Sequence, residues 1–478
     1  MLIPESEIAE HLRFTNPWWR TGAIDPLYER LPRRAYFPRF QTAVARTTPR
    51  RTVILLGPRR VGKTVMVHHA ISALIAGGTD PRRILHLAVD TPTFTGRSLE
   101  QLLRLGMRVV DYEPESFEPF FVFLDEIQYV RDWERELKTL TDTFTAVEFV
   151  ATGSAAAALR AKSTESGAGR FSTFALPPLT FAEFIDLREE TRGLFEIGEG
   201  DVFAKAEDAE RQRSEWVDYL HFGGYPEVLF DEGLRQNPGQ YIRRDIVERV
   251  LTRDLPQLYG ITDVRELNQF FTVLCYQTGQ EVSPQVLSKQ SDGIRKETIG
   301  RYLEYLEAAF LLRVLDKVDL SARRLLRRTR YKCYLTVPSL RTALFAPLPP
   351  DRDGFGHLNE TGVLSQWAPA GDDGLAYASW PAGEVDLVGR DPLSQKAAWA
   401  TEIKWSNRYY EKPSDLKPLR KFCLEQGLRR AVCTTVNKSG TAYTAGIEVT
   451  FLPNASYAYT IGYNAATENQ RLRWLSTK

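Results

Sequence analysis

The segment from Gly57 to Thr64 constrains the fold of this chain more than any other. It has the sequence GPRRVGKT, and it lies between a short apolar run, Thr52 to Leu56, and the helix-like stretch VMVHHAISAL. Two glycines in this spacing let the backbone curl until its N–H groups face a phosphate, and the helix that follows adds a favourable dipole. The pattern therefore predicts a strand, a phosphate-binding loop and a helix, in that order.

The loop residues are predicted to bind a nucleotide. The lysine would reach the β and γ oxygens, and the threonine hydroxyl would ligate Mg²⁺. The sequence thus predicts ATP and Mg²⁺ as cofactors, bound by Gly57, Pro58, Arg59, Arg60, Val61, Gly62, Lys63 and Thr64.

A second apolar run, FFVFLD, ends in two adjacent carboxylates, Asp125 and Glu126. Four such runs, at 52–56, 84–90, 120–125 and 147–152, alternate with helix-like stretches, which predicts a parallel sheet covered on both faces. Ligands bind such sheets at the carboxyl ends of the strands. Asp125 is therefore expected to hold Mg²⁺, and Glu126 to polarise the water that attacks the γ-phosphate.

Two later residues have two interpretations each. Ser154, at the end of the run VEFVATGS, would sense the γ-phosphate through its hydroxyl or simply cap a helix. Arg170 follows the small, polar segment AKSTESGAG. It would act as an arginine finger, in cis or from a neighbouring subunit, or be an ordinary surface arginine.

A second set of candidate residues lies near the C-terminus. Asp386, in GEVDLV, and Glu402, in ATEIK, fall on consecutive predicted strands, and the period of two places Glu402 and Lys404 on one strand face. The two carboxylates are predicted to hold Mg²⁺, and the lysine to orient a nucleophile or stabilise the charge of a phosphodiester. Glu360, in a helix-like stretch, would add a third acid. Alternating charge on a solvated strand is the alternative explanation.

Between these regions lies a compact helical module at about 263–318, followed by a strand-like run. Its second helix is predicted to expose residues that could contact phosphates and base edges of DNA, namely Arg295, Lys296, Thr298 and Arg301. A basic cluster at 323–332 follows, consisting of Arg323, Arg324, Arg327, Arg328, Arg330 and Lys332. Packing against another domain, or a merely solvated face, is the alternative.

Several of these motifs occur in an order that resembles a known family. GPRRVGKT, FVFLDEIQYVRDWERELKTL, ATGSAAAAL, GRFSTFALPPLTFAEF and HFGGYPEV are similar to prokaryotic AAA-type ATPases with a C-terminal domain of unknown function that is similar to restriction endonucleases. The resemblance implies an α/β fold: an AAA-like P-loop core with a sensor strand between the P-loop and Walker B strands, a helical lid, a winged helix and a PD-(D/E)xK-like nuclease domain. The segments implied are an aromatic and basic leader at 1–46, then 47–178, 179–260, 261–335 and 336–478.

Composition limits the remaining possibilities. Lys and Arg number 62 against 61 Asp and Glu, so the net charge of +1 gives no global field for nucleic acid. The four scattered cysteines form no C-x-x-C pair, and no apolar stretch is long enough for a membrane helix or a secretion signal. A reduced, cytoplasmic protein without a membrane partner is expected, and a homo-oligomer is compatible with the pattern.

These observations favour one function over another. The sequence predicts a magnesium-dependent ATPase coupled to DNA binding, with metal-dependent DNA cleavage by the C-terminal domain. The alternative is an ATP-controlled signalling or scaffold switch whose nuclease-like domain binds without cleaving. The absence of G-x-G-x-x-G and G-x-S-x-G motifs excludes a Rossmann oxidoreductase and a serine hydrolase.

Overall fold

The computed structural model describes residues 3–46, 51–113, 118–154, 169–322, 329–367, 374–391 and 393–467. It divides into two compact units, Met1–Leu176 and Pro177–Lys478, each of which is described by itself. The five segments that the sequence implies are thus distributed over two bodies. Within the described residues, no helix combines the length and the apolar character that crossing a membrane requires.

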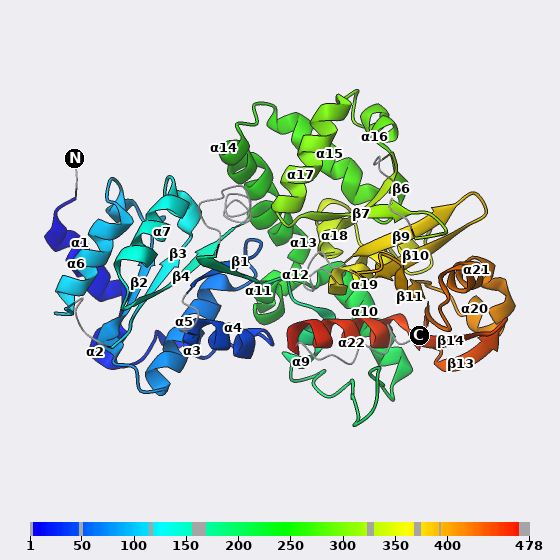
Figure 1. Ribbon diagram of the computed structural model, residues 1–478, viewed down its shortest axis with the longest axis horizontal. Helices are drawn as coiled ribbons and strands as arrows, with labels where there is room; N and C mark the ends of the chain where they lie inside the picture. The colour runs from blue at the N-terminus through cyan, green and yellow to red at the C-terminus, as the bar shows by residue number, and fades with distance from the viewer. Residues whose placement is uncertain are drawn as a thin grey trace. The chain divides into compact units, whose positions relative to one another are not determined.

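The first unit is built on a five-stranded parallel sheet with the order β2-β3-β4-β1-β5 (Figure 1). The predicted parallel sheet is confirmed, and so is the position of the sensor strand β4 between the P-loop strand β1 and β3. The strands are β1 (Thr52–Leu56), β2 (Ile84–Ala88), β3 (Phe120–Asp125), β4 (Val147–Gly153) and β5 (Phe171–Ala175).

Helices cover this sheet because the strands are apolar on both faces; all residues of β1 and β3 are buried. The helices are α1 (Glu5–Thr15), α2 (Trp18–Thr21), α3 (Pro26–Glu29), α4 (Phe37–Ala45), α5 (Lys63–Ala76), α6 (Leu99–Val109) and α7 (Trp133–Thr143). The short 3₁₀ turns are η1 (Pro81–Arg83), η2 (Pro92–Phe94) and η3 (Ile127–Tyr129).

The N-terminal leader is part of this unit. The indole nitrogens of Trp18 and Trp19 both donate to the carbonyl of Ile84, at 2.9 and 2.8 Å. The side chain of Asn16 pairs with the backbone of His86, accepting from its N–H at 2.7 Å and donating to its carbonyl at 3.1 Å. These bonds satisfy backbone groups of β2, the edge strand, and so close that edge of the sheet.

The second unit contains a nine-stranded mixed sheet with the order β13-β14-β12-β11-β10-β9-β7-β8-β6. Its strands are β6 (Glu281–Val282), β7 (Leu312–Val318), β8 (Tyr331–Leu335), β9 (Leu375–Trp380), β10 (Gly383–Arg390), β11 (Ala397–Glu402), β12 (Arg430–Thr435), β13 (Gly440–Thr444) and β14 (Ile447–Pro453).

Helices precede, interrupt and follow these strands. The α-helices are α9 (Phe181–Asp186), α10 (Ala209–Phe222), α11 (Pro226–Phe230), α12 (Glu232–Gln236), α13 (Pro238–Tyr241), α14 (Leu255–Tyr259), α15 (Val264–Tyr276), α16 (Pro284–Gln290), α17 (Lys296–Ala308), α18 (Ser339–Leu344), α19 (Phe355–Trp367), α20 (Arg408–Glu411), α21 (Lys417–Gln426) and α22 (Asn454–Thr467). The π-helical segments are η5 (Ile242–Glu248) and η6 (Val250–Asp254), and η8 (Pro413–Asp415) is a 3₁₀ turn.

One sheet joins the helical module to the C-terminal strands. β7 pairs with β8 antiparallel and with β9 parallel, so that Asp316 lies beside Ala376 and Val318 beside Ala378. The predicted boundary at residue 336 therefore lies between strands of a single sheet. As a result, β8 and the carboxylate-bearing strands β10 and β11 belong to the same layer.

Helix α19 is buried in the core of the second unit, where α22 packs against it. Polar side chains fix its rotation: Asn359 accepts from the indole nitrogen of Trp216 at 2.8 Å and donates to Asn454 at 2.9 Å. Gly362 has no room for a side chain, since a Cβ there would lie 2.2 Å from a methyl group of Leu220. These contacts place Glu360, the residue after Asn359, against β8.

Candidate functional site

The glycine-rich loop of the first unit has the geometry that its sequence predicts. Gly62 has a φ of +90°, which favours glycine, and Lys63 begins helix α5 directly after it. Gly57 lies so close to the backbone that a Cβ would be 2.3 Å from the carbonyl oxygen of Leu176. The ammonium of Lys63 donates to the loop carbonyls of Gly57 and Pro58, at 3.1 and 2.9 Å. The loop is therefore closed around the lysine that would meet a phosphate.

Other contacts hold the middle of this loop. The guanidinium of Arg34, from the leader, donates to the carbonyl of Val61 at 2.7 Å, and both side chains are buried. Arg60 adopts a left-handed conformation, with a φ of 64°, while Arg59 donates to the hydroxyl of Tyr129 at 3.3 Å. The role of Arg34 was not predicted, because a basic residue in an aromatic leader carries no signal for a contact 27 residues away.

Asp125 is held at the carboxyl end of β3 by two hydroxyl groups. Thr64 donates to its Oδ2 at 2.8 Å, and Thr152 donates to its Oδ1. The backbone N–H of Glu126 in turn donates to the Thr152 hydroxyl at 3.0 Å. Burial lowers the pKa of His86, whose ring lies 3.9 Å from Asp125, so this histidine is neutral at neutral pH. A carboxylate and a hydroxyl oxygen side by side fit the all-oxygen coordination that Mg²⁺ prefers.

Glu126 and Ser154 are joined by Gln128. The amide nitrogen of Gln128 donates to the Glu126 carboxylate, and its amide oxygen accepts from the backbone N–H of Ser154 at 3.1 Å. Glu126 itself has a left-handed backbone, with a φ of 60°. The structure thus places Ser154 near the carboxylate through its backbone, whereas the hydroxyl that contacts the acidic pair belongs to Thr152. Position at the end of β4 was the only sequence signal for Thr152.

Arg170 lies at the amino ends of the strands, whereas the glycine-rich loop lies at their carboxyl ends. β5 runs parallel to β1, and the carbonyl of Arg170 accepts from the N–H of Thr52, the first residue of β1. Five strand residues at about 3.3 Å each separate this end from the loop. The side chain is exposed and pairs with Asp142 at 2.8 Å. The prediction of an arginine finger in cis is therefore wrong, because parallel pairing carries the residue to the amino ends of the strands.

In the second unit, the structure brings together all four predicted C-terminal residues. The ammonium of Lys404 lies 2.8 Å from Oδ2 of Asp386 and 2.8 Å from Oε1 of Glu402. The N–H of Ile403 donates to the same Asp386 oxygen at 2.8 Å. β11 ends at Glu402, and two hydrogen bonds fix the backbone of Lys404 beyond it: its N–H donates to the Thr434 hydroxyl, and its carbonyl accepts from the amide of Asn454. The predicted pairing of the two carboxylates follows from the antiparallel contact between β10 and β11.

Lys332 completes this cluster from β8, although it was predicted to contact DNA. Its side chain is only 3% exposed, and its ammonium lies 2.9 Å from Glu360 and 2.7 Å from Glu384. The hydroxyl of Tyr334 also donates to Glu360. The assignment of Lys332 to a phosphate-binding surface is therefore wrong, because a strand residue of this sheet face points into the layer between sheet and α19. The cluster of Lys332, Glu360, Glu384, Asp386, Glu402 and Lys404 is called the carboxylate cluster below.

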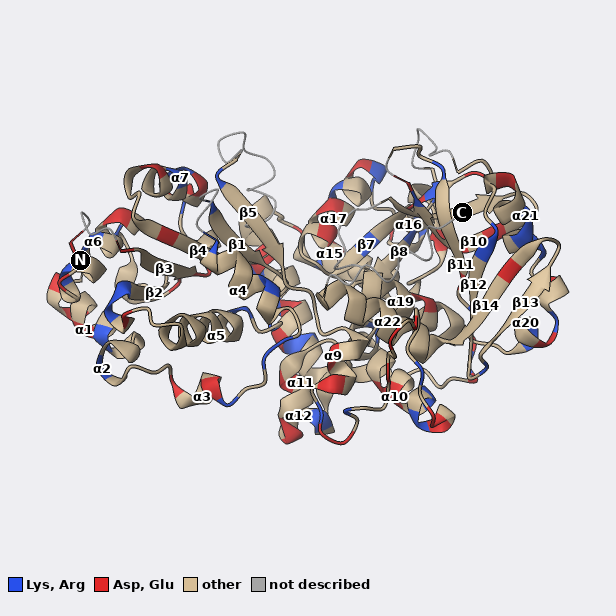
Figure 2. Cartoon of the chain, turned by 60° about the horizontal axis from the view of Figure 1, so that its bottom comes forward, with Lys and Arg blue, Asp and Glu red and all other residues tan. Residues whose placement is uncertain are grey.

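The rest of the predicted DNA-binding residues are placed only in part. Arg295, Lys296 and Arg301 are exposed on or beside α17, and Arg301 donates to the hydroxyl of Thr298 at 3.4 Å. Arg330 pairs with Glu281 at 2.9 Å. The residues of the basic cluster that lie outside the described part of the chain are Arg323, Arg324, Arg327 and Arg328. Figure 2 shows acidic and basic residues interspersed on the exposed elements.

The carboxylates of the cluster differ in the direction in which their pKa is shifted. Burial, followed by the neighbouring Asp386, raises the pKa of Glu402 to about 8, and Lys404 only partly opposes this. Burial alone would raise the pKa of Glu360 as well, but Lys332, together with the hydrogen bond from Tyr334, lowers it. Glu402 is 7% exposed, and its Oε2 is buried without a hydrogen-bond partner.

An unpartnered, buried carboxylate oxygen fits a cation, which would supply the missing charge. Within the described ranges, no group of three or more His, Cys, Asp or Glu side chains has the spacing of a metal site. The protein thus offers one cation two carboxylates, those of Asp386 and Glu402, and further ligands would be backbone or water.

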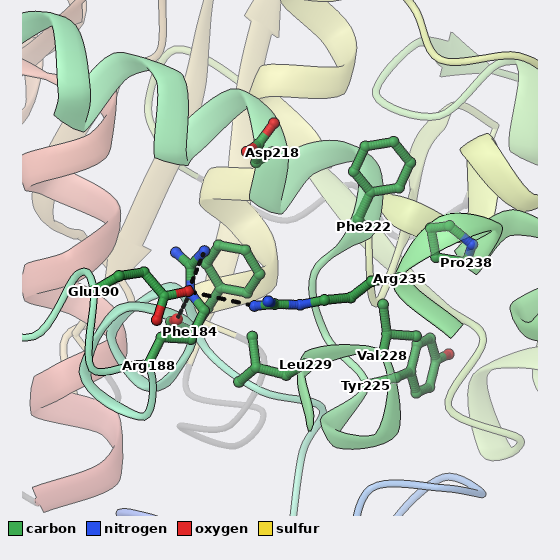
Figure 3. A pocket seen from close by; sticks show the side chains of 10 residues that line it. All are labelled: Phe184, Arg188, Glu190, Asp218, Phe222, Tyr225, Val228, Leu229, Arg235 and Pro238. Atoms are coloured by element: carbon green, nitrogen blue, oxygen red, sulfur yellow. Dashed lines mark hydrogen bonds and ion pairs between the residues drawn. The ribbon is translucent and has the colours of Figure 1, made fainter. Parts of the chain in front are cut away.

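A separate pocket of about 290 Å³ lies elsewhere in the second unit, as Figure 3 shows. Phe184, Val228 and Leu229 supply apolar walls, and the guanidinium of Arg188 lies 4.2 Å from the Phe184 ring centroid. The two arginines of the pocket, Arg188 and Arg235, already have carboxylate partners. None of its lining residues belongs to the carboxylate cluster.

Comparison with known families places the glycine-rich loop in a recognised domain. Residues 49–185 match the family model described as an AAA domain, and residues 213–351 match a domain of unknown function, DUF8612. Residues 49–185 form an AAA-type P-loop domain. The second match includes α15, α16, α17 and both β7 and β8. This AAA-type domain contains every predicted ATP-site residue.

Individual relatives are distant. An uncharacterized protein of Haemophilus influenzae is 26% identical over 297 residues, which cover 60% of this chain and 68% of the relative. Two uncharacterized proteins of Methanocaldococcus jannaschii are 24% and 26% identical, and the chain spans 57% and 62% of their lengths. Among solved structures, the S. cerevisiae Hsp104-ADP complex aligns with 59% of this chain and 39% of its own, at 14% identity and a TM-score of 0.30.

Proposed function

We propose that the AAA-type domain binds ATP with Mg²⁺ and hydrolyses it. The observation that carries this proposal is the contact of Thr64, at the end of the glycine-rich loop, with Asp125, at the end of β3. It links the two sequence motifs across 61 residues at the carboxyl edge of a parallel sheet, where ligands of such folds bind. Bound Mg²⁺ would neutralise the charge of the β and γ phosphate oxygens.

Each residue of the proposed site has its own role. When ATP binds, Lys63 exchanges the loop carbonyls for phosphate oxygens, and the N–H groups of the loop and of the first turn of α5 face the phosphates. Thr64 and Asp125 are the residues that would hold the metal. Glu126 accepts a hydrogen bond from the attacking water on the carboxylate oxygen that Gln128 does not hold, and polarises it. Gln128 thus positions Glu126 and does not contact the substrate.

Phosphate release with ATP and Mg²⁺ tests this proposal. Lys63→Ala should abolish nucleotide binding, whereas Glu126→Gln should retain binding and lose turnover, because the amide cannot act as the base. Glu100→Gln, on the exposed side of α6, changes the same group away from the loop and should behave as wild type. Undiminished turnover by Glu126→Gln would contradict the assigned role.

We also infer that the second unit binds DNA and cleaves it in a metal-dependent reaction. The element order α15, β6, α16, α17, β7 and β8, in which β8 pairs with both β6 and β7, supports a winged helix. The exposed basic residues of α17 support phosphate contacts. The buried, unpartnered Oε2 of Glu402 beside Asp386 and Lys404 supports a PD-(D/E)xK-like metal site.

Cleavage assays separate this function from the alternative of an ATP-controlled switch. Linear, branched and single-stranded DNA would be incubated with Mg²⁺ or Mn²⁺, with and without ATP. Cleavage by wild type that is lost in Lys404→Ala supports the nuclease, and its loss in Lys63→Ala would show that ATP controls it. DNA-stimulated ATP turnover without any cleavage would instead favour the switch.

We propose, third, that copies of this chain associate and that Arg170 acts between them. Its side chain is 42% exposed at the amino ends of the strands, away from its own loop, so a contact with nucleotide would have to be made in a neighbouring subunit. In sedimentation experiments ATP should shift the chain to larger species. Arg170→Ala should reduce turnover only at concentrations at which these species form, and equal loss at every dilution would refute a role in trans.

A further inference from the structure

The carboxylate cluster has two halves, each with an ammonium group between two acids. In one half, Lys404 lies 2.8 Å from both Asp386 and Glu402. In the other, Lys332 lies 2.9 Å from Glu360 and 2.7 Å from Glu384. The halves adjoin at Asp386, whose Oδ1 is 4.0 Å from the ammonium of Lys332. A two-metal phosphoryl-transfer site, whose ions lie about 3.5–4 Å apart, would need one cation in each half.

We propose that Lys332 limits the carboxylate cluster to one divalent cation, held by Asp386 and Glu402, because its ammonium occupies the position of a second. This inference rests on the proposed metal site of the second unit. In this proposal, Lys332 stays in place between two acids, whereas Lys404 gives up its place to the cation.

The two lysines differ in how firmly they are held. The side chain of Lys404 is 27% exposed, so its ammonium can swing toward solvent when a cation takes its place between the two acids. The side chain of Lys332 is 3% exposed and its ammonium lies 5.3 Å from the centre of the Tyr377 ring. It extends from β8, which is paired on both sides. A buried ammonium that lost its partners would be strongly unfavourable, so Lys332 stays.

The acids of the two halves also differ in the contacts that their carboxylate oxygens make. Glu402 keeps a buried oxygen, Oε2, without any hydrogen-bond partner. In Glu360, Oε1 contacts both Lys332 and Tyr334, and Oε2 lies 3.9 Å from the ring of His357. A cation therefore finds a buried, unpartnered ligand in the first half, whereas Lys332 and Tyr334 already hold the helical acid of the second.

The charge of the cluster also depends on Lys332. When ionised, the carboxylates of Glu360, Glu384, Asp386 and Glu402 carry four negative charges, and the two lysines carry two positive charges. Removing the ammonium of Lys332 leaves one uncompensated negative charge more and vacates the space between two acids.

Manganese stoichiometry tests the inference on the full chain. Electron paramagnetic resonance and calorimetry would count bound Mn²⁺ without nucleotide, in an Asp125→Asn background so that the ATP site does not contribute. We expect one Mn²⁺ in this parent protein and two in Lys332→Met, with spin coupling between the pair. Lys317→Met is the matched control, because Lys317 on the neighbouring β7 pairs with Glu281 at 3.4 Å, and it should keep one.

The outcomes are distinguishable. Two Mn²⁺ in the parent protein would overturn the limit set by Lys332 and leave the metal site standing, and this holds even if Lys332→Met does not fold. A single Mn²⁺ in a folded Lys332→Met, as judged by circular dichroism, would also overturn the limit. No Mn²⁺ in the parent protein, under conditions where Asp386→Asn behaves identically, would reject the metal site itself and the inference with it.

Discussion

Replacing Thr152 by valine removes a single buried hydroxyl from the proposed ATP site with almost no change of shape. That hydroxyl donates to Oδ1 of Asp125 and accepts from the N–H of Glu126 at 3.0 Å. A hydrogen bond to a charged group contributes about 1.5–3 kcal/mol, and a neutral one about 1 kcal/mol. The variant should therefore lose about 3 kcal/mol of unfolding free energy in the first unit.

The same change should weaken metal binding. Asp125 would keep only the Thr64 hydroxyl to orient its carboxylate, and loss of such an outer contact typically costs about 10- to 100-fold in metal affinity. Urea unfolding measures the first effect, and the Mg²⁺ concentration that supports half-maximal ATP turnover measures the second. We expect this concentration to rise by at least about 10-fold.

Thr141→Val is the matched control. The Thr141 hydroxyl is also buried and bonds to the hydroxyl of Thr52 at 2.8 Å and to the carbonyl of Leu137 at 2.7 Å, but it lies at the amino edge of the sheet. The variant should lose about 2 kcal/mol, about 1 kcal/mol for each neutral hydrogen bond, and leave the Mg²⁺ requirement unchanged. If both variants show the same Mg²⁺ requirement, Thr152 does not act through Asp125 and the reasoning is refuted.

Three further variants have defined outcomes. Burial raises the pKa of Asp186 from 3.8 to about 6, so its stabilising contribution is complete below the lower value and is lost as pH rises through the higher one. Asp186→Asn should accordingly add on the order of 2 kcal/mol in urea unfolding at pH 7 and nothing at pH 3.5; an equal gain at both would contradict this. Gly57→Ala, whose methyl group would meet the Leu176 carbonyl, should abolish binding of a fluorescent ATP analogue. Gln128→Leu should lower kcat with KM for ATP unchanged, and a change in KM alone would show that it does not act through Glu126.

The sequence predicts most residues of the proposed ATP site because the motifs that carry them are local. The eight loop residues are contiguous, and their glycines and lysine owe their positions to the strand and helix on either side. Asp125 followed from the rule that ligands bind at the carboxyl ends of parallel strands. The partners that orient these residues were missed, since Thr152, Gln128 and Arg34 reach the site from segments that carry no motif of their own.

Arg170 and Lys332 show where pattern alone misled. Arg170 follows a glycine-rich segment, but parallel pairing of β5 with β1 decides which end of the sheet it occupies. Lys332 ends a run of basic residues in the sequence, yet β8 belongs to the sheet whose strands β10 and β11 carry three acids of the carboxylate cluster. From the sequence alone, a charged residue is expected on the surface. Whether it is buried depends on which strand lies beside it, and the sequence does not specify that.

By itself, the sequence determined the phosphate-binding loop, the acidic pair after β3, and the two strands that carry Asp386 and Glu402. These features depend on the period of two along a strand and on backbone conformations that only glycine adopts readily, both of which are encoded within a few residues. Only the tertiary structure decided that β7 joins the helical module to β9, and that Lys332 therefore lies among the carboxylates. Strand order and register depend on hydrogen bonds between segments far apart in the chain, which no local pattern specifies.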